Sequence, residues 1–204
     1  MPSVNPVLAE LPLWSSVSPS DWDDALAGYE QAIGALPSGR LSALDQWYRH
    51  ELPVAVASRT PRHLTYDEMV CVTEWKMARG VWRAPNLVLV RRNVPGAVED
   101  ATMLASSLTD ALPKALAAVS VLSGVGPATA SAALAVLAPE RFPFFDEIVA
   151  GQVTSLGPVA WTATFYRKYA AALVARAADL PDGWHATMVE RALWAHGVNA
   201  GVRV

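Results

Sequence analysis

A single carboxylate that follows a glycine-rich turn is the group in this sequence best placed to do chemistry. The turn is Gly124-Val-Gly126, and the carboxylate is that of Asp146, directly after the proline-containing segment 142–145. Glycines let backbone N–H groups approach a ligand closely, and the N-terminus of the next helix favours an anion such as phosphate. A carboxylate nearby can stabilise positive charge in a transition state and can orient a water molecule.

Two helices must position these groups. The spacing of apolar residues predicts one helix over 109–122 and a second over 127–137, joined by the glycine turn. Pro127 suits the first turn of the second helix because it has no N–H that would be left unpaired. The side chain of Val125 can turn inward and fix the turn. The residues expected to bind a phosphate are therefore Gly124, Val125, Gly126, Ala128 and Thr129.

The turn and its surroundings resemble the helix-hairpin-helix (HhH-GPD) superfamily of DNA glycosylases. The family pattern Leu-x-Gly-Val-Gly-x-x-Thr-Ala is matched by Leu122, Gly124, Val125, Gly126, Thr129 and Ala130. In that family the catalytic Asp lies 18 positions beyond the residue that precedes the Thr, and here 146 − 128 = 18. The resemblance is specific over residues 122–151.

This resemblance implies a monofunctional N-glycosylase that removes a damaged, modified or mismatched base from DNA. Asp146 would be the catalytic residue and would stabilise an oxocarbenium-like sugar, while Glu147 would point about a quarter-turn away. Bifunctional relatives carry a Lys nucleophile at the position of Ala128, so no lyase activity is expected. The family architecture is an all-α, two-lobed fold with a groove between the lobes. DNA is the implied partner.

Three alternatives to this interpretation stay open. An Asp that opens a helix is often only its N-cap, and both roles can coexist in Asp146. Glycine turns of this kind also occur in non-catalytic modules that bind the DNA backbone or a protein partner. The same Asp could instead act on the N-glycosidic bond of a free nucleoside or modified nucleotide.

A second segment, Glu74-Trp-Lys-Met-Ala-Arg-Gly80 with Arg83, resembles an EWKxxRGxxR signature of an uncharacterised subgroup of the same superfamily. Trp75 and Trp82 are expected near a base-binding pocket, whereas the other tryptophans are expected in the core: Trp14, Trp22, Trp47, Trp161, Trp184 and Trp194. The residues expected to line the pocket or contact DNA are Glu74, Trp75, Lys76, Arg79, Arg83 and Glu147.

Composition excludes several classes of protein. The chain of 204 residues is 52% hydrophobic and 17% charged, which is typical of a globular domain. A single cysteine excludes a disulfide framework and a four-Cys iron–sulfur cluster, and the four histidines lack metal-ligand spacing. We therefore expect no metal and no cofactor. No signal peptide or membrane span is expected either, which predicts a cytoplasmic protein.

The net charge of −3 is unfavourable for DNA binding, because phosphate neutralisation supplies most non-specific affinity. The charge is unevenly distributed, however. Residues 59–92 contain seven bases and three acids, so this segment carries +4 and the remainder −7. The sequence therefore predicts a local basic face on an acidic body.

Helical spacing runs through most of the chain and predicts an all-α fold. The expected helices are 21–36, 40–51, 65–80, 84–92, 94–108, 109–122, 127–137, 146–156, 158–179 and 183–196. Thr65 and Glu68 predict a capping box, and helix ends are expected at Gly39, Gly80 and Gly197. Residues 1–20 are expected to be an extended segment and 21–204 a single two-lobed domain. Residues 65–157, with the hairpin 109–138, would form the central lobe, and 21–52 would pack with 158–204 as the second.

Overall fold

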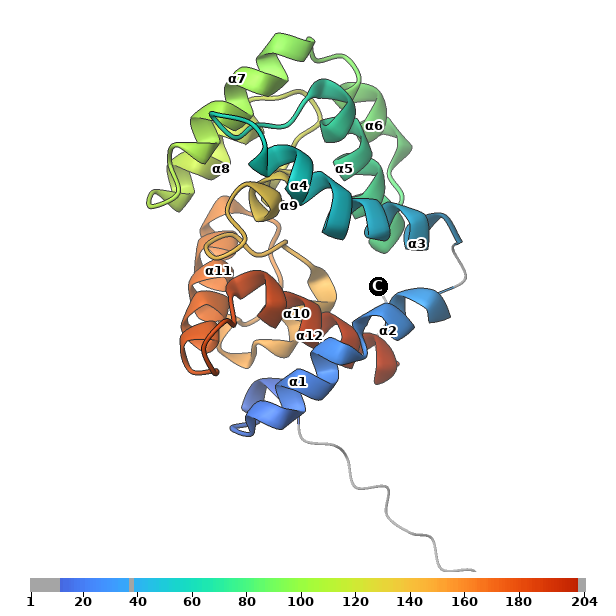
Figure 1. Ribbon diagram of the computed structural model, residues 1–204, viewed down its shortest axis with the longest axis vertical. Helices are drawn as coiled ribbons and strands as arrows, with labels where there is room; N and C mark the ends of the chain where they lie inside the picture. Colours follow the sequence, from blue (N-terminus) through green and yellow to red (C-terminus); the bar gives the residue numbers. More distant parts are fainter. Residues whose placement is uncertain (1–11, 37–38, 202–204) are drawn as a thin grey trace, which may run out of the picture.

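The computed structural model describes residues 12–36 and 39–201 (Figure 1). Every regular element in these two stretches is a helix. None of the helices in them is long and apolar enough to cross a membrane. The elements are a 3-10 turn (Leu13–Ser15), α1 (Pro19–Ala27), α2 (Tyr29–Ala35), α3 (Gly39–Gln46), a π-helical turn (Trp47–Glu51), α4 (Leu52–Ala57), α5 (Tyr66–Arg79), α6 (Ala84–Val90), α7 (Pro95–Ser106), α8 (Leu112–Ser120), α9 (Pro127–Leu137), α10 (Glu147–Gln152), a second 3-10 turn (Thr154–Leu156), α11 (Ala163–Ala178) and α12 (Ala186–Asn199).

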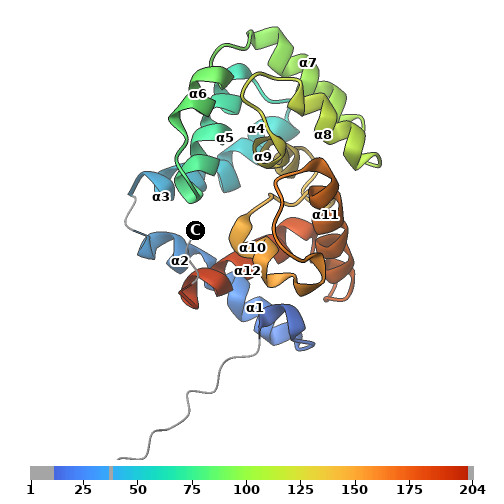
Figure 2. The ribbon, with the colours of Figure 1, turned by 180° about the vertical axis from the view of Figure 1, so that it is seen from behind.

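The helices form two groups, which lie one above the other in Figures 1 and 2. The α9 group consists of α4, α5, α7 and α8, which pack on α9, together with α3 and α6, which pack on α5. Helix α9 is buried from Thr129 to its end. The α12 group consists of α1, α2, α10 and α11 packed around α12. The chain passes from the α9 group to the α12 group through residues 138–146, so Asp146 lies at the junction of the two groups.

The boundaries of these groups differ from those expected. Helices α1 and α2 do pack on α12, but α3 packs on α5 and α4 packs on α9. Helix α10 belongs with α12 and not with the central helices. Of the expected extended segment 1–20, residues 1–11 lie outside the described residues, and residues 12–20 contain a 3-10 turn and the start of α1.

Local signals set several of the helix ends. The capping box at α5 is confirmed, since Thr65 Oγ1 accepts from Glu68 N (3.3 Å) and Glu68 Oε2 accepts from Thr65 N (2.8 Å). Helix α5 ends before Gly80, and α9 begins at Pro127, both as predicted. Both of these helix ends meet the same pocket.

Two glycines expected to end helices do not do so. Gly39 is the first residue of α3, and Gly197 lies within α12. A Cβ at Gly197 would be 2.5 Å from Ile148 Cγ2 and 2.8 Å from Gln152 Nε2. The glycine therefore lets α12 and α10 approach closely, which fixes the helix that Asp146 opens.

Candidate active site

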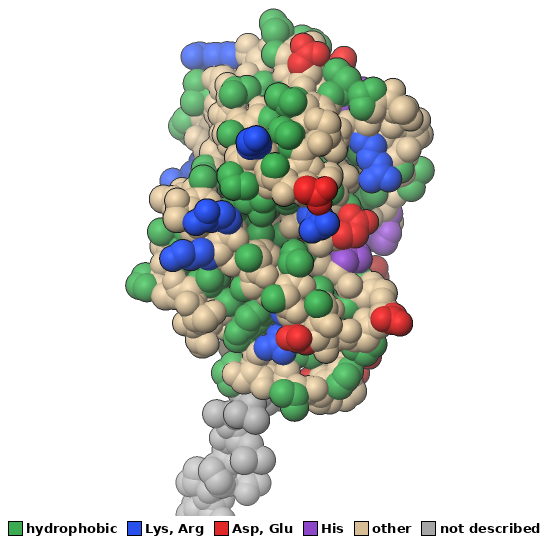
Figure 3. Space-filling view, turned by 90° about the vertical axis from the view of Figure 1, so that its left-hand side faces the viewer, with side chains coloured by type: hydrophobic (Ala, Val, Ile, Leu, Met, Phe, Trp, Pro, Cys, Tyr) green, Lys and Arg blue, Asp and Glu red, His purple; other side chains and the backbone are tan. Residues whose placement is uncertain are grey.

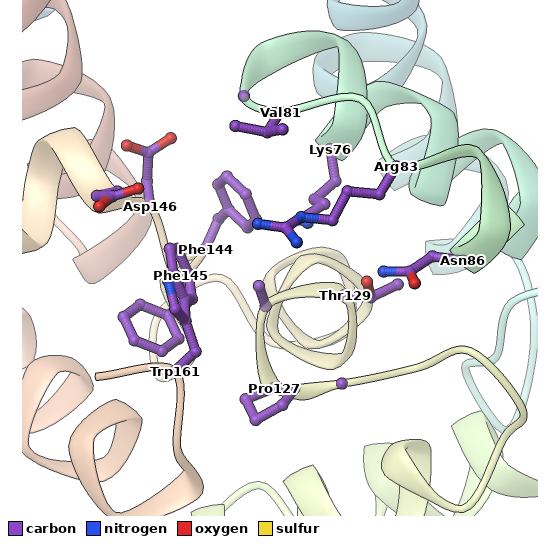
Figure 4. A pocket seen from close by; sticks show the side chains of 14 residues that line it. Lys76, Val81, Arg83, Asn86, Pro127, Thr129, Phe144, Phe145, Asp146 and Trp161 are labelled. Carbon is purple, nitrogen blue, oxygen red and sulfur yellow. The ribbon is translucent and has the colours of Figure 1, made fainter. Parts of the chain in front are cut away.

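A pocket with a volume of about 290 Å³ lies at the junction of the two helix groups, and Asp146 lines it. Its other walls come from the end of α5, the loop 80–83, the start of α6, the start of α9 and the segment 144–147, together with Trp161. Figure 4 shows Asp146 on one side of this pocket, with Lys76, Arg83 and Asn86 on the other. The carboxylate and the basic side chains therefore face a common space.

Asp146 is both the N-cap of α10 and a wall of the pocket. Its Oδ1 accepts from the backbone N–H groups of Ile148 (2.8 Å) and Val149 (3.4 Å). Its Oδ2 lies 3.3 Å from Arg79 Nε. The residue is buried, yet it remains in contact with the cavity. The capping role is thus present, and it leaves the second oxygen at the junction.

The electrostatic environment of Asp146 contains opposing contributions. Burial raises the pKa of its carboxyl group above the ordinary value, because the charged form loses its hydration. The Arg79 guanidinium and the two backbone N–H donors act in the opposite direction and lower this pKa. The ionisation of Asp146 therefore depends on the groups around it.

The segment that carries Asp146 is held from both sides. Phe145 N donates to Ser131 Oγ on α9 (2.9 Å). From α11, the hydroxyl of Tyr166 donates to Pro143 O (3.0 Å) and that of Tyr169 to Phe144 O (2.7 Å). A chain segment without regular structure is thus given a defined path, which places its carboxylate.

Two of the basic residues expected to line a pocket or contact DNA, Lys76 and Arg83, line this pocket. Neither forms an ion pair with any residue in the described part of the chain. Burial of Lys76 lowers the pKa of its ammonium group, and the nearby charge of Arg83 lowers it further, while Asp146 opposes the effect. Both cations are available to a ligand with acceptor atoms.

The aromatic wall of the pocket differs from the one expected. Trp75 is fully buried, stacks on Tyr48 and donates from Nε1 to Asp45 Oδ1 (2.8 Å), so the prediction that it lies in the pocket is wrong. Trp161, assigned to the core, is exposed and lines the pocket instead, with its ring centroid 4.7 Å from that of Phe145. Trp161 lies before the start of α11 at Ala163, in a segment without regular structure, so the prediction of a helix from residue 158 is wrong there.

The loop between α8 and α9 has two glycines with different roles. Gly124 has φ +78° and packs against α6, where a Cβ would meet Asn86 O at 2.7 Å. Gly126 borders the pocket and has open space where a Cβ would be. Val125 is buried, as predicted, and Ala128 and Thr129 line the pocket. Of the residues expected to bind phosphate, Gly126, Ala128 and Thr129 meet the pocket.

The prediction that Arg79 lines the pocket or contacts DNA is wrong. Its side chain is buried and is the centre of an ionic network beneath the pocket. It pairs with Asp146 and, through Nη2, with Glu190 Oε1 of α12. Arg49 Nη2 lies 3.3 Å from Glu190 Oε2 and Arg49 Nε lies 3.8 Å from Asp45 Oδ1. Sequence reasoning missed Asp45, Arg49 and Glu190, because partners up to 141 residues apart form the network.

The predicted basic face is reduced by ion pairing. Glu74 is not in the pocket and binds Arg40 (2.5 Å) and Arg91 (2.9 Å), while Arg59 binds Glu68 (2.6 Å). Glu147 lies exposed at the pocket. Figure 3 shows one face of the molecule, on which basic, acidic and hydrophobic side chains are interspersed. Exposed, unpaired positive charge on the segment 59–92 is therefore smaller than its composition suggests.

Within the described residues, no group of three or more His, Cys, Asp or Glu side chains is arranged to hold a metal ion. Comparison of the chain with models of known protein families, with curated proteins and with solved structures gave no match.

Proposed function

We propose that the protein is an N-glycosidase of the DNA glycosylase type, with Asp146 as its catalytic carboxylate. The observation that carries this proposal is the position of Asp146 in a pocket that also contains hydrogen-bond donors and aromatic rings. The match of residues 122–151 to the helix-hairpin-helix pattern supports DNA as the substrate.

The reaction follows from the charge that develops on the sugar. As the C1′–N bond breaks, its electron pair leaves with the base and positive charge grows on C1′ and the ring oxygen. The Asp146 carboxylate stabilises that charge and orients a water molecule, whose oxygen bonds to C1′ and whose proton is released. The products are the free base and an abasic sugar.

The pocket offers recognition elements for an extruded base. Trp161 provides an exposed flat apolar surface for stacking. Lys76, Arg83 and Asn86 provide donors for the base edge or an adjacent phosphate. Ala128 supplies no nucleophile at the position where bifunctional relatives carry Lys. The proposed enzyme therefore leaves the abasic strand uncut.

The test is base release from a panel of duplexes, each with one modified, damaged or mismatched base. Strand breaks should appear only after alkali treatment, and Asp146→Asn should lower the rate by about 100-fold or more. Asn caps helices as well as Asp does, so this variant should remain folded. Asp182→Asn, at an exposed loop position, is the matched control and should retain full activity.

Two outcomes would contradict the proposal. Wild-type protein that releases no base from any duplex would exclude the enzyme, and equal rates for Asp146→Asn and wild type would exclude the assigned residue. If duplexes bind without release and Gly126→Arg abolishes binding while Asp146→Asn does not, the protein is a non-catalytic binding module.

A second candidate is N-glycoside hydrolysis on a free nucleoside or modified nucleotide. The pairing of Arg59, Arg79 and Arg91 with acidic partners favours it, because these residues are then less able to neutralise a DNA backbone. Both candidates use the same pocket and carboxylate. Release of base from nucleosides or nucleotides, with none from duplexes, would favour this candidate over the first.

A further inference from the structure

The Asp146 carboxylate, which lines the pocket, is paired with a buried arginine. The side chain of Arg79 is fully buried, and its Nε lies 3.3 Å from Asp146 Oδ2. This contact is an ion pair without hydrogen-bond geometry, since Arg79 Nε has no hydrogen-bond acceptor. Within the described residues Asp146 Oδ2 accepts no hydrogen bond, so the Arg79 charge lies beside it without occupying it as a hydrogen-bond acceptor.

Arg79 is itself fixed from several directions. Its Nη2 donates to Glu190 Oε1, and its Nη1 donates to Tyr29 OH at 3.3 Å. The guanidinium carbon lies 4.4 Å from the centroid of the Trp194 ring. Arg79 belongs to the α9 group, whereas Asp146 and Glu190 lie at or in the α12 group. The ion pair with Asp146 therefore exists only when the two helix groups are packed together.

The charges of the network are balanced. Three carboxylates face two guanidinium groups, those of Arg49 and Arg79; the carboxylates are those of Asp45, Asp146 and Glu190. The guanidinium carbon of Arg191, 4.6 Å from the centroid of the Tyr29 ring, adds a third positive charge, so the net charge of the group is zero. On the pocket side, the charged side chains that line the cavity with Asp146 are those of Lys76, Arg83 and Glu147. Removal of Arg79 alone would leave the buried carboxylates of Asp146 and Glu190 without the positive charge that both now pair with.

From this arrangement we infer that Arg79, fixed by Glu190, is the positioning residue that keeps Asp146 ionised and directed at the pocket. The inference deepens the proposed function, on which its catalytic consequence rests. A nucleotide in the pocket would contact Asp146, which lines it, whereas Arg79 does not line the pocket and acts only through the Asp146 carboxylate. An arginine that merely holds the two helix groups together would leave the ionisation of Asp146 unchanged when it is replaced.

The test compares the titration of the Asp146 carboxyl group by carbon NMR in Glu190→Gln and in the double variant Arg79→Gln/Glu190→Gln. The double variant keeps the net charge and avoids an unpaired Glu190. The pKa of Asp146 should be higher in the double variant than in Glu190→Gln by about 1–3 units, because the double variant lacks the positive charge of Arg79 beside the carboxylate. Arg79→Lys/Glu190→Gln restores a positive charge and should return the titration toward that of Glu190→Gln.

A further double variant guards against misfolding. Arg79→Met/Glu190→Leu replaces the pair by apolar groups, an exchange that proteins often tolerate, and should raise the Asp146 pKa in the same way. Asp146→Asn identifies the resonance. Equal titration of Asp146 with and without the Arg79 charge in the folded variants would overturn the inference.

Activity provides an independent readout. In the double variants the acidic limb of the base-release profile should move to higher pH by the same amount as the Asp146 pKa, with kcat reduced more than KM is raised. If no substrate is cleaved by wild type, the proposed function fails, and the NMR titration still decides the role of Arg79. If base release is found but the titration of Asp146 does not move, the function stands and the inference fails.

Discussion

Gly124 lies so close to α6 that a Cβ at this position would be 2.7 Å from the backbone oxygen of Asn86. The amide side chain of Asn86 lines the pocket, so this contact links the loop between α8 and α9 to the pocket wall. The loop is therefore part of the support for the site, in addition to any contact it makes with a ligand.

The two loop glycines should respond differently to alanine. Gly124→Ala meets backbone and side-chain atoms at 2.7–2.8 Å and requires a positive φ, so it should lower the free energy of unfolding by roughly 1–3 kcal/mol from the backbone conformation alone. At Gly126 a Cβ would have open space around it, so Gly126→Ala should change the free energy of unfolding by about 1 kcal/mol or less. Urea unfolding of both variants measures the difference. Equal destabilisation would contradict the assigned roles.

Replacement of Lys76 should separate stability from function. Because burial and Arg83 lower the pKa of Lys76, its charged form is disfavoured in the folded state, and Lys76→Met should be at least as stable as wild type near neutral pH. The variant should lose a charged hydrogen bond to substrate of about 1.5–3 kcal/mol, roughly 10- to 100-fold in kcat/KM. The exposed Lys168 provides the control Lys168→Met. An equal loss of activity in both would argue against a role for the pocket amine.

Trp161 should be the stacking platform of the site. Trp161→Ala should weaken ligand binding by about 1–3 kcal/mol, the usual contribution of an aromatic ring stacked on a base. Trp82 is the matched control, because it is 45% exposed against 46% for Trp161, yet it does not line the pocket. Binding measured by fluorescence titration should be nearly unchanged in Trp82→Ala. The reverse order of effects would show that the aromatic surface near Arg40 is the binding site.

The raised pKa of Asp146 predicts a defined dependence of stability on pH. In the folded protein the carboxyl group holds its proton to higher pH than the unfolded value of 3.8, so its contribution to stability falls as pH rises through the folded pKa. The asparagine variant does not titrate. The free energy of unfolding of Asp146→Asn, relative to wild type, should therefore increase from about pH 4 upward. A difference that is constant with pH would contradict the raised pKa.

The local features of the site were readable from the sequence because each depends on residues a few positions apart. Pro127 starts α9 since its missing N–H costs nothing there, and Asp146 caps α10 by accepting from N–H groups two and three residues further on. The inward orientation of Val125 follows equally from the turn itself. Helical periodicity likewise predicted the all-α class.

Only tertiary packing decided what surrounds Asp146. Arg79 and Glu190 are 111 residues apart, and no local pattern distinguishes an arginine that will be buried in such a network from one that contacts DNA. The exchange of roles between Trp75 and Trp161 has the same origin, since both are apolar rings whose exposure depends on which helices cover them. Sequence determined the local shape of the helix ends. The electrostatic environment of the carboxylate was instead decided by the tertiary contacts that bring Arg79 of α5 to Glu190 of α12 and to Asp146, because charge interactions depend on distance in space.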